Sequence, residues 1–355
     1  MRTFFFYLGL TLAGLAFFFY ARAINNDYLF FAGYTVLQFV VLATAWNILG
    51  GYCGYVNFGS AAFFAIGAYS AVALHKLGAN IDRYFPEQLA DIAKLVLPFN
   101  VPTLIVVGGF ISGLIGLGTG YLTLRLRGAF FAIATLALAV VLQTLIVNFD
   151  FVGGSRGAYI IRPSEVPIIG NYIQYLFIVM MVLSIVALGV ARAIERSRLG
   201  YGFATIRDDE LAAEACGVPT LRLKLVATTL SGALMGMAGA PFPYYIGYLE
   251  PGSAFSINYA VNSIAMPMIG GTTSWVGPLI GALLLGTAQQ YIIVTISSAV
   301  GVLVVGLMLI IFVIGAPNGI VGLVQEFMRA GAKADGAPTW RSRLASFANM
   351  RPGAR

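Results

Sequence analysis

The residues of this chain that could do chemistry are gathered in one short polar segment, 192–224. It holds eleven of the 35 charged residues, and long apolar runs flank it on both sides. A charged side chain inside hydrocarbon is costly, so we expect this segment to be an aqueous loop with structure of its own. The chemistry available to it is ion pairing and docking. Its charged residues are Arg192, Glu195, Arg196, Arg198, Arg207, Asp208, Asp209, Glu210, Glu214, Arg222 and Lys224.

Residues 208–217 have the pattern of a short, capped helix. Asp209 and Glu210 stand in its first turn, where acidic side chains complement the helix dipole. Gly217 fits a C-terminal cap, and Pro219 prevents the helix from continuing. A helix this short is marginal alone. It therefore rests either on the chain's own helix ends or in a cleft of a separate subunit.

Residues 195–199 are expected to continue the preceding helix into the aqueous phase. Gly200 and Gly202 follow them, and the pattern predicts that the chain breaks there before the short helix begins.

Catalytic chemistry finds little support in the sequence. The chain has one histidine, His75, so it cannot supply a multi-histidine metal site, and no His-Glu-x-x-His motif occurs. Gly59-Ser60 offers a serine, but only His75 could act as its base. No Gly-Lys dipeptide is present, hence no phosphate-binding loop of the Walker type. We expect no catalytic residue, no metal site and no cofactor bound by this chain.

The composition predicts the elements that must carry this segment. Hydrophobic residues make up 59% of the chain and charged residues 10%, whereas soluble domains have about 25% charged residues. The apolar runs are long enough to cross a bilayer. We therefore expect an all-α polytopic membrane protein with about ten spans. They are 4–21, 28–49, 57–77, 101–124, 129–148, 172–192, 225–246, 258–271, 276–294 and 298–316.

The third and eighth of these spans are expected to be irregular or interrupted. Gly50, Gly51 and Gly54 precede the third span, and Pro267 stands in the short eighth span before Gly270. Irregular backbone at membrane depth is tolerated where it is buried in protein or lines a cavity, and it often marks a transport path.

Lysine and arginine counts set the orientation. With the amino terminus in the cytoplasm, 15 of these residues fall on the cytoplasmic side and 6 on the other, as the positive-inside rule requires. Segment 192–224 and a basic tail, 317–355, are then both cytoplasmic, and residues 1–316 form the membrane domain. The positive charge is thus explained by topology, and no nucleic-acid partner is expected.

No Asp or Glu lies inside an expected span, so the carboxylate relay that proton-coupled carriers need is missing.

Several motifs, in order along the chain, resemble one known family. Segment 211–217 is similar to the Glu-Ala-Ala-x-x-x-Gly loop of bacterial ABC importer permeases, and 206–224 more closely resembles branched-chain amino acid permeases of the LivM type. Further motifs of that family are matched by Asn47–Tyr52 with Asn57–Phe64, Leu126–Gly128 with Phe131 and Thr135, Gly270–Gly271 with Trp275 and Gly277–Pro278, and Pro317–Gly322.

The resemblance implies a permease subunit of an ABC importer in the bacterial inner membrane. It also implies a second homologous permease, two cytoplasmic ATPase subunits that bind ATP and Mg²⁺, and a periplasmic solute-binding protein. The residues that would couple to the ATPase are Arg207, Asp208, Glu210, Ala212, Ala213, Glu214 and Gly217. Those expected near the substrate path are Asn57, Gly59, Phe63, Phe131, Thr135 and Gly270.

An outer loop, formed by Gly153, Gly154, Ser155 and Arg156, is expected near the substrate's entrance. Arg156 stands where the family commonly has Asn or Asp. Two alternatives stay open at this point: a urea or amide importer of the same family, and an autonomous ion-coupled carrier or channel.

Overall fold

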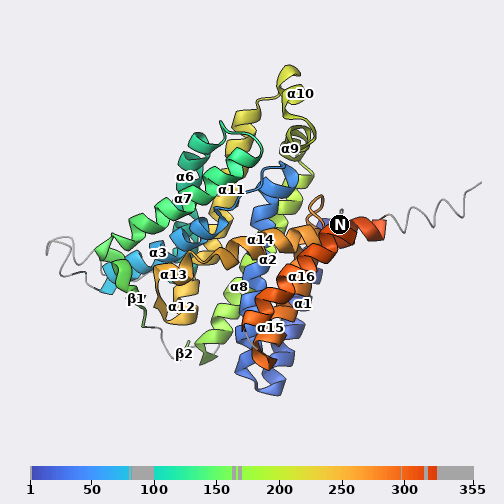
Figure 1. Ribbon diagram of the computed structural model, residues 1–355. Helices are drawn as coiled ribbons and strands as arrows, with labels where there is room; N and C mark the ends of the chain where they lie inside the picture. The colour runs from blue at the N-terminus through green and yellow to red at the C-terminus, as the bar shows by residue number, and fades with distance from the viewer. Residues whose placement is uncertain are drawn as a thin grey trace, which may run out of the picture.

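The fold is a bundle of long helices, seen in a computed structural model that describes residues 2–79, 81, 100–161, 165–166, 170–296, 298–315 and 319–325 (Figure 1). Eight helical stretches in this part of the chain are long and apolar enough to cross a membrane. The expected all-α membrane architecture is therefore confirmed. The long helices are α1 (Arg2–Ile24), α2 (Asp27–Asn47), α3 (Ser60–Ala79), α6 (Val101–Thr123), α7 (Ala129–Val147), α8 (Tyr172–Glu195), α11 (Thr220–Gly239) and α15 (Val276–Thr295).

Two of the ten expected spans are not among these eight stretches. The expected span 258–271 is α14 (Ile257–Gly270), which has only 14 residues and contains Pro267 without a break. The expected span 298–316 is α16 (Ser298–Gly315), which has 18 residues, none of them charged.

The centre of the bundle is α11. It packs most extensively against α6 and also contacts α3 and α2, while α2 in turn packs against α8 and α15. Close backbone approach makes this possible: a Cβ at Gly239 of α11 would lie 1.9 Å from the carbonyl oxygen of Phe64 in α3. Small residues at such crossings are how membrane helices pack tightly. By contrast, α1 and α7 expose most of their apolar side chains, and both lie at the periphery.

The irregular stretch expected around the third span lies just before it. After α2 the chain forms a π-helical turn, η1 (Ile48–Tyr52), and then runs without helix through residues 53–59 to the start of α3. We call this non-helical segment connector 53–59. Such π-turns occur frequently at functional sites.

Two short helices project from one end of the bundle. Figure 1 shows α10 (Glu210–Ala215) at the top, beyond the ends of the long helices, and α9 (Arg198–Asp208) just below it. The expected break at Gly200 and Gly202 is wrong, because both glycines lie within α9. The break comes earlier, at Arg196 and Ser197, so the expected continuation of the preceding helix through residues 195–199 is also wrong. The Ser197 hydroxyl caps α9 by accepting from Leu199 N and Gly200 N.

Short elements also connect the helices away from α10. Strand β1 (Ala158–Tyr159) pairs antiparallel with β4 (Tyr248–Leu249), and β2 (Glu165–Val166) pairs with β3 (Gly170–Asn171). The remaining elements are η2 (Asp150–Val152), η3 (Gly154–Arg156), α12 (Phe242–Ile246), α13 (Pro251–Ala254) and a helical turn at 319–325. Most of the basic tail expected at 317–355, including everything after 325, lies outside the described residues.

Candidate functional site

The short helix α10 is capped at both ends. The Asp209 side chain accepts from Ala212 N over 3.0 Å at the N-terminus. Gly217 adopts φ +82° at the C-terminus, and the amides of Gly217 and Val218 return to the carbonyls of Glu214 and Ala213. This is the Schellman pattern, so the cap expected at Gly217 is confirmed. Six residues cannot hold a helix alone, and contacts with the bundle must stabilise it.

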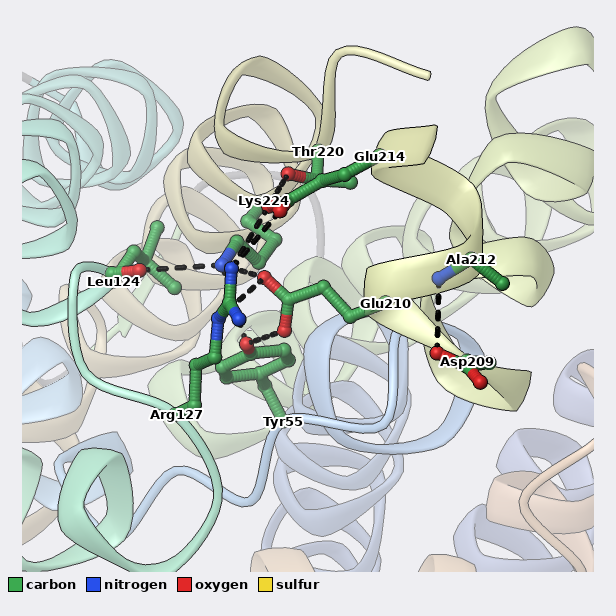
Figure 2. Close-up of polar contacts among 9 residues, drawn as sticks. All are labelled: Tyr55, Leu124, Arg127, Asp209, Glu210, Ala212, Glu214, Thr220 and Lys224. Atoms are coloured by element: carbon green, nitrogen blue, oxygen red, sulfur yellow. Dashed lines mark hydrogen bonds and ion pairs between the residues drawn. The ribbon is translucent and has the colours of Figure 1, made fainter. Parts of the chain in front are cut away.

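One of those contacts is a buried ion pair centred on Glu210 (Figure 2). Lys224 Nζ, on α11, donates to Glu210 Oε1 over 2.7 Å, and the two side chains are only 3% and 12% exposed. The Tyr55 hydroxyl donates to the other carboxylate oxygen of Glu210. Lys224 also donates to the Tyr55 hydroxyl and the Leu124 carbonyl, each over 3.2 Å. Residues far apart in sequence therefore meet at one carboxylate.

A second, more exposed ion pair joins Glu214 to Arg127. Arg127 Nη2 lies 3.1 and 3.0 Å from the two carboxylate oxygens of Glu214, and Thr220 Oγ1 donates to Glu214 Oε1 over 2.8 Å. Arg127 Nε also lies 3.6 Å from Glu210 Oε1. The Arg127 and Glu214 side chains are 50% and 40% exposed. Water screens pairs of this kind, and each contributes at most about 1 kcal/mol.

These partners keep the Glu210 carboxylate charged. Burial alone would raise its pKa, but hydrogen bonds from Lys224 and Tyr55, with the positive charges of Lys224 and Arg127, outweigh burial and hold the pKa below its usual value. For Tyr55 the effects add: burial and the neighbouring Glu210 both raise the pKa of its hydroxyl. Tyr55 thus stays a neutral donor to a charged acceptor.

The expected coupling residues separate into two faces of α10. Glu210, Ala213 and Glu214 point toward the bundle, and Ala213 is buried. Ala212 is exposed and faces away together with Leu211, whose side chain is 64% exposed. At the end of α9, Arg207 pairs with the exposed Asp208 over 3.2 Å. The backbone of Arg207 packs closely on Gly54. Sequence reasoning placed Glu210, Ala212, Ala213 and Glu214 on one short helix without distinguishing its faces, but Arg207 and Asp208 belong to the end of α9.

Connector 53–59 joins this cluster to the interior. Tyr55 packs edge-on against the Phe131 ring of α7, with ring centroids 5.1 Å apart. Trp46 Nε1 donates to the Asn57 carbonyl over 2.9 Å, and the Asn57 side chain accepts from Gly59 N over 2.7 Å. Phe58 N donates to Thr135 Oγ1 over 3.2 Å. The connector is therefore bonded at one end to α10 and at the other to α7.

Five of the six expected path residues lie around one small cavity between α3, α6, α7 and α11. Its volume, about 10 Å³, is near the size that holds one water molecule. No amino acid fits this cavity, and we refer to it below as the constriction. The five are Asn57, Gly59, Phe63, Phe131 and Thr135, and the lining also includes Thr119, Thr123 and Thr228.

Two features of the cavity extend what the sequence predicted. Sequence reasoning missed Thr119 and Thr123, although their spacing of four placed both on one face of α6. Gly270 lies elsewhere, at the end of α14, where a Cβ would come within 1.8 Å of the Gly277 carbonyl oxygen. Its position fits close packing between α14 and α15.

The outer-loop residues form tight turns at the base of β1. Gly153 and Gly154 have φ of +105° and +53°, and Arg156 is exposed. The Arg156 carbonyl accepts from the Tyr248 hydroxyl over 2.6 Å, which ties this turn to β4. Ser155 is also exposed. The sequence expectation of an entrance at this loop stays a prediction.

Of the three arginines at the start of segment 192–224, Arg192 is packed in the bundle, whereas Arg196 and Arg198 are exposed. Arg192 is buried, with its guanidinium carbon 4.3 Å from the Phe6 ring centroid and 5.7 Å from that of Trp275. The Glu195 carboxylate accepts from Trp275 N over 2.8 Å at the start of α15. Among the residues that the structure describes, no three His, Cys, Asp or Glu side chains come together as a metal site would require.

Comparison with known proteins identifies the family of this chain. The family described as "branched-chain amino acid transport system / permease component" matches residues 6–313. The high-affinity branched-chain amino acid transport system permease proteins LivM of Salmonella typhimurium and Escherichia coli are each 24% identical over 317 residues, covering 82% of this chain and 69% of theirs. A probable branched-chain amino acid transport permease protein LivH of Methanocaldococcus jannaschii is 24% identical over 281 residues, covering 75% and 83%. No solved structure matches significantly.

Proposed function

Because the chain belongs to the family of branched-chain amino acid transport system permease components, we propose that it is the membrane-spanning subunit of an ABC importer for branched-chain or related amino acids. The observation that carries this proposal is the match over residues 6–313, which includes the spans, the constriction and α10. Curated relatives named as branched-chain amino acid permeases support the choice of solute.

ATP hydrolysis takes place on a separate chain in this proposal. The sequence has no Gly-Lys dipeptide and so no Walker-type phosphate loop, while α10 presents the exposed Leu211 at the end of the molecule. An apolar side chain on a projecting, capped helix suits insertion into a groove of a partner, as amphipathic helices do elsewhere. One ATPase subunit would dock in this way on this chain and a second on the partner permease, and each would bind its own ATP and Mg²⁺.

The complete importer would contain a second homologous permease and a periplasmic binding protein. The peripheral helices α1 and α7 leave apolar faces for lipid and for the second permease. The relatives carry two different permease names, LivM and LivH, which supports a pair of homologous subunits. A solute delivered by a binding protein needs only a path through the bundle, and a constriction lined by threonine and asparagine near aromatic rings suits that task.

In the proposed orientation, α10 faces the cytoplasm of a bacterium and both termini lie on that side of the inner membrane. The lysine and arginine counts of 15 against 6 support it. Phe6, near the start of α1, packs on Arg192 at the end of α8, which is consistent with the amino terminus and α9 sharing one side.

Uptake into proteoliposomes that contain the complete importer tests this function. The permease is reconstituted with the ATPase, the partner permease and the binding protein of the proposed importer, and entry of labelled leucine is followed. We expect leucine to enter only when ATP is present on the side of the membrane where the ATPase lies and the binding protein is present on the opposite side. Uptake of urea but not leucine would reassign the solute. Leucine entry that ignores ATP and follows a sodium or proton gradient would contradict the ABC assignment.

A further inference from the structure

The inward face of α10 is bonded to the segment that leads into the constriction. Glu210 is held by Lys224 and Tyr55, and Tyr55 begins the run of contacts through connector 53–59 that ends at Phe131 and Thr135. We propose that α10, the start of α11 and connector 53–59 move as one unit, so that displacement of α10 by a docked ATPase reaches the constriction through Glu210, Lys224 and Tyr55. This inference rests on the proposed function.

Burial of the ion pair is the reason for treating these elements as one unit. The Lys224 side chain is 3% exposed, and Glu210 is its one carboxylate neighbour at hydrogen-bond distance among the residues that the structure describes. If α10 moved alone, the ammonium group would keep only the neutral Leu124 carbonyl and Tyr55 hydroxyl. A buried charge without its partner is strongly unfavourable. Moving the two helices together keeps the pair intact and is the less costly displacement.

The connector can transmit this displacement because both of its faces are engaged. Gly54 touches Arg207 of α9, with an added Cβ only 3.0 Å from Arg207 Cγ. Tyr55 N donates to the Leu49 carbonyl, which anchors the residue to the π-helical turn. Phe131, against which Tyr55 packs, is 1% exposed and lines the constriction. Tyr55 therefore cannot shift without moving Phe131 or changing its own contact with it.

The two faces of α10 then have separable roles. Leu211 faces outward and binds the ATPase, whereas Glu210 faces inward and passes the motion on. The exposed ion pair of Glu214 with Arg127 is a second link between α10 and the bundle. Water screens the two charges, so this link is weaker. Lys224 and Tyr55 are positioning residues in this scheme, because they act on the constriction through other groups.

The test uses the reconstituted importer with Lys224→Met, Glu210→Gln and Tyr55→Phe. Arg222→Met is the matched control, since Arg222 lies on the same helix two residues from Lys224 but is exposed. Coupling between sites typically corresponds to about 5–150-fold. We therefore expect each of the three variants to keep its ATPase subunits and ATP hydrolysis but to lose at least about tenfold in leucine uptake per ATP. Arg222→Met should resemble the wild type.

A second measurement reports directly on movement of connector 53–59. Cys53 lies in connector 53–59 and is buried, and the other cysteine, Cys216, is exposed. In a Cys216→Ser background, maleimide labelling of Cys53 should change between the ATP-bound and nucleotide-free importer. That change should disappear in Tyr55→Phe, which keeps the ring and removes only the hydroxyl.

The outcomes separate this inference from the proposed function. A wild-type importer without ATP-driven leucine uptake would overturn the function itself. An active wild type in which Lys224→Met and Tyr55→Phe transport as well as Arg222→Met would overturn the inference alone. Labelling of Cys53 that is the same with and without ATP in the active wild type would also overturn the inference alone. If Lys224→Met fails to fold, Tyr55→Phe decides by the same measurements.

Discussion

The pairing of Lys224 with Glu210 makes a quantitative prediction about stability that needs no partner subunit. The perturbation is a double-mutant cycle: Glu210→Gln, Lys224→Met and the two combined. Each single change removes one charge of a pair whose Nζ and Oε1 lie 2.7 Å apart. The combined change removes both charges and leaves side chains of similar size.

The expected magnitudes follow from burial. Breaking a buried ion pair by removing one partner costs about 3–5 kcal/mol, whereas replacing both partners together is often neutral. In Glu210→Gln the ammonium of Lys224 keeps two neutral acceptors, which lowers the expected cost to about 2–3 kcal/mol. Lys224→Met should cost less, because Glu210 is more exposed than Lys224 and keeps Tyr55 and Arg127. The coupling energy of the cycle should then be about 1–3 kcal/mol.

Thermal unfolding of the purified permease in detergent measures this cycle. Unfolding of large proteins is usually irreversible, so apparent melting temperatures are compared at one fixed scan rate. We expect the double variant to melt above Glu210→Gln, although it carries one change more. If the losses of the two single variants add in the double variant, the two charges do not stabilise one another and the reasoning is refuted.

Three further predictions concern the described contacts. The pKa of Glu210 is held below its usual value, so its pairing stabilises the fold above the unfolded-state pKa of about 4.5 and the stabilisation is lost as pH falls through the lower folded value; a melting profile against pH should show this loss in the wild type and not in Glu210→Gln. Gly239→Ala places a Cβ 1.9 Å from the Phe64 carbonyl oxygen and should cost about 1–3 kcal/mol by overpacking, whereas Gly118→Ala, with no atom within 4 Å, should leave the melting temperature unchanged or higher. Leu211→Glu should abolish co-purification of the ATPase without lowering the melting temperature, because Leu211 is 64% exposed; retention of the ATPase would argue against docking on this face.

The long helices and the C-terminal cap of α10 could be predicted because they depend on local sequence. Apolar runs of sufficient length gave the eight spans, and Gly217 before Pro219 gave the end of α10. The break before α9 could not be placed in the same way. Two glycines inside α9 suggested a break, but Gly200 is required by packing, since a Cβ there would lie 2.3 Å from the Ile194 carbonyl oxygen. The helix instead begins at Ser197, which caps it.

The orientation of α10 could not be predicted because its partners are distant in sequence. Tyr55 and Arg127 lie 155 and 87 residues from the glutamates they bind. The resemblance to the permease loop motif made Glu214 look like a docking residue, yet the structure pairs it with Arg127 in the same chain. Reversing the charge of Glu214 would set two positive groups together, so its effect on docking could not be separated from its effect on the chain's own fold.

The cavity residues were grouped by resemblance to family motifs rather than by physical derivation. The structure brings Asn57, Gly59, Phe63, Phe131 and Thr135 to one constriction. Gly270 also comes from a glycine-containing motif, but it lies where α14 packs closely against α15. Sequence patterns do not distinguish a glycine that lines a path from one that lets two helices touch.

The docking of a separate ATPase on α10 is most directly tested by the reactivity of Cys216. This exposed thiol follows α10, and the chain's other cysteine, Cys53, is buried. Membranes containing the permease alone are labelled with a membrane-impermeant maleimide, and the rate is compared with that in membranes also containing its ATPase. We predict that the bound ATPase slows Cys216 labelling markedly and that Leu211→Glu restores the rate of the permease alone. Equal labelling in the presence of a stably bound ATPase would contradict docking at α10.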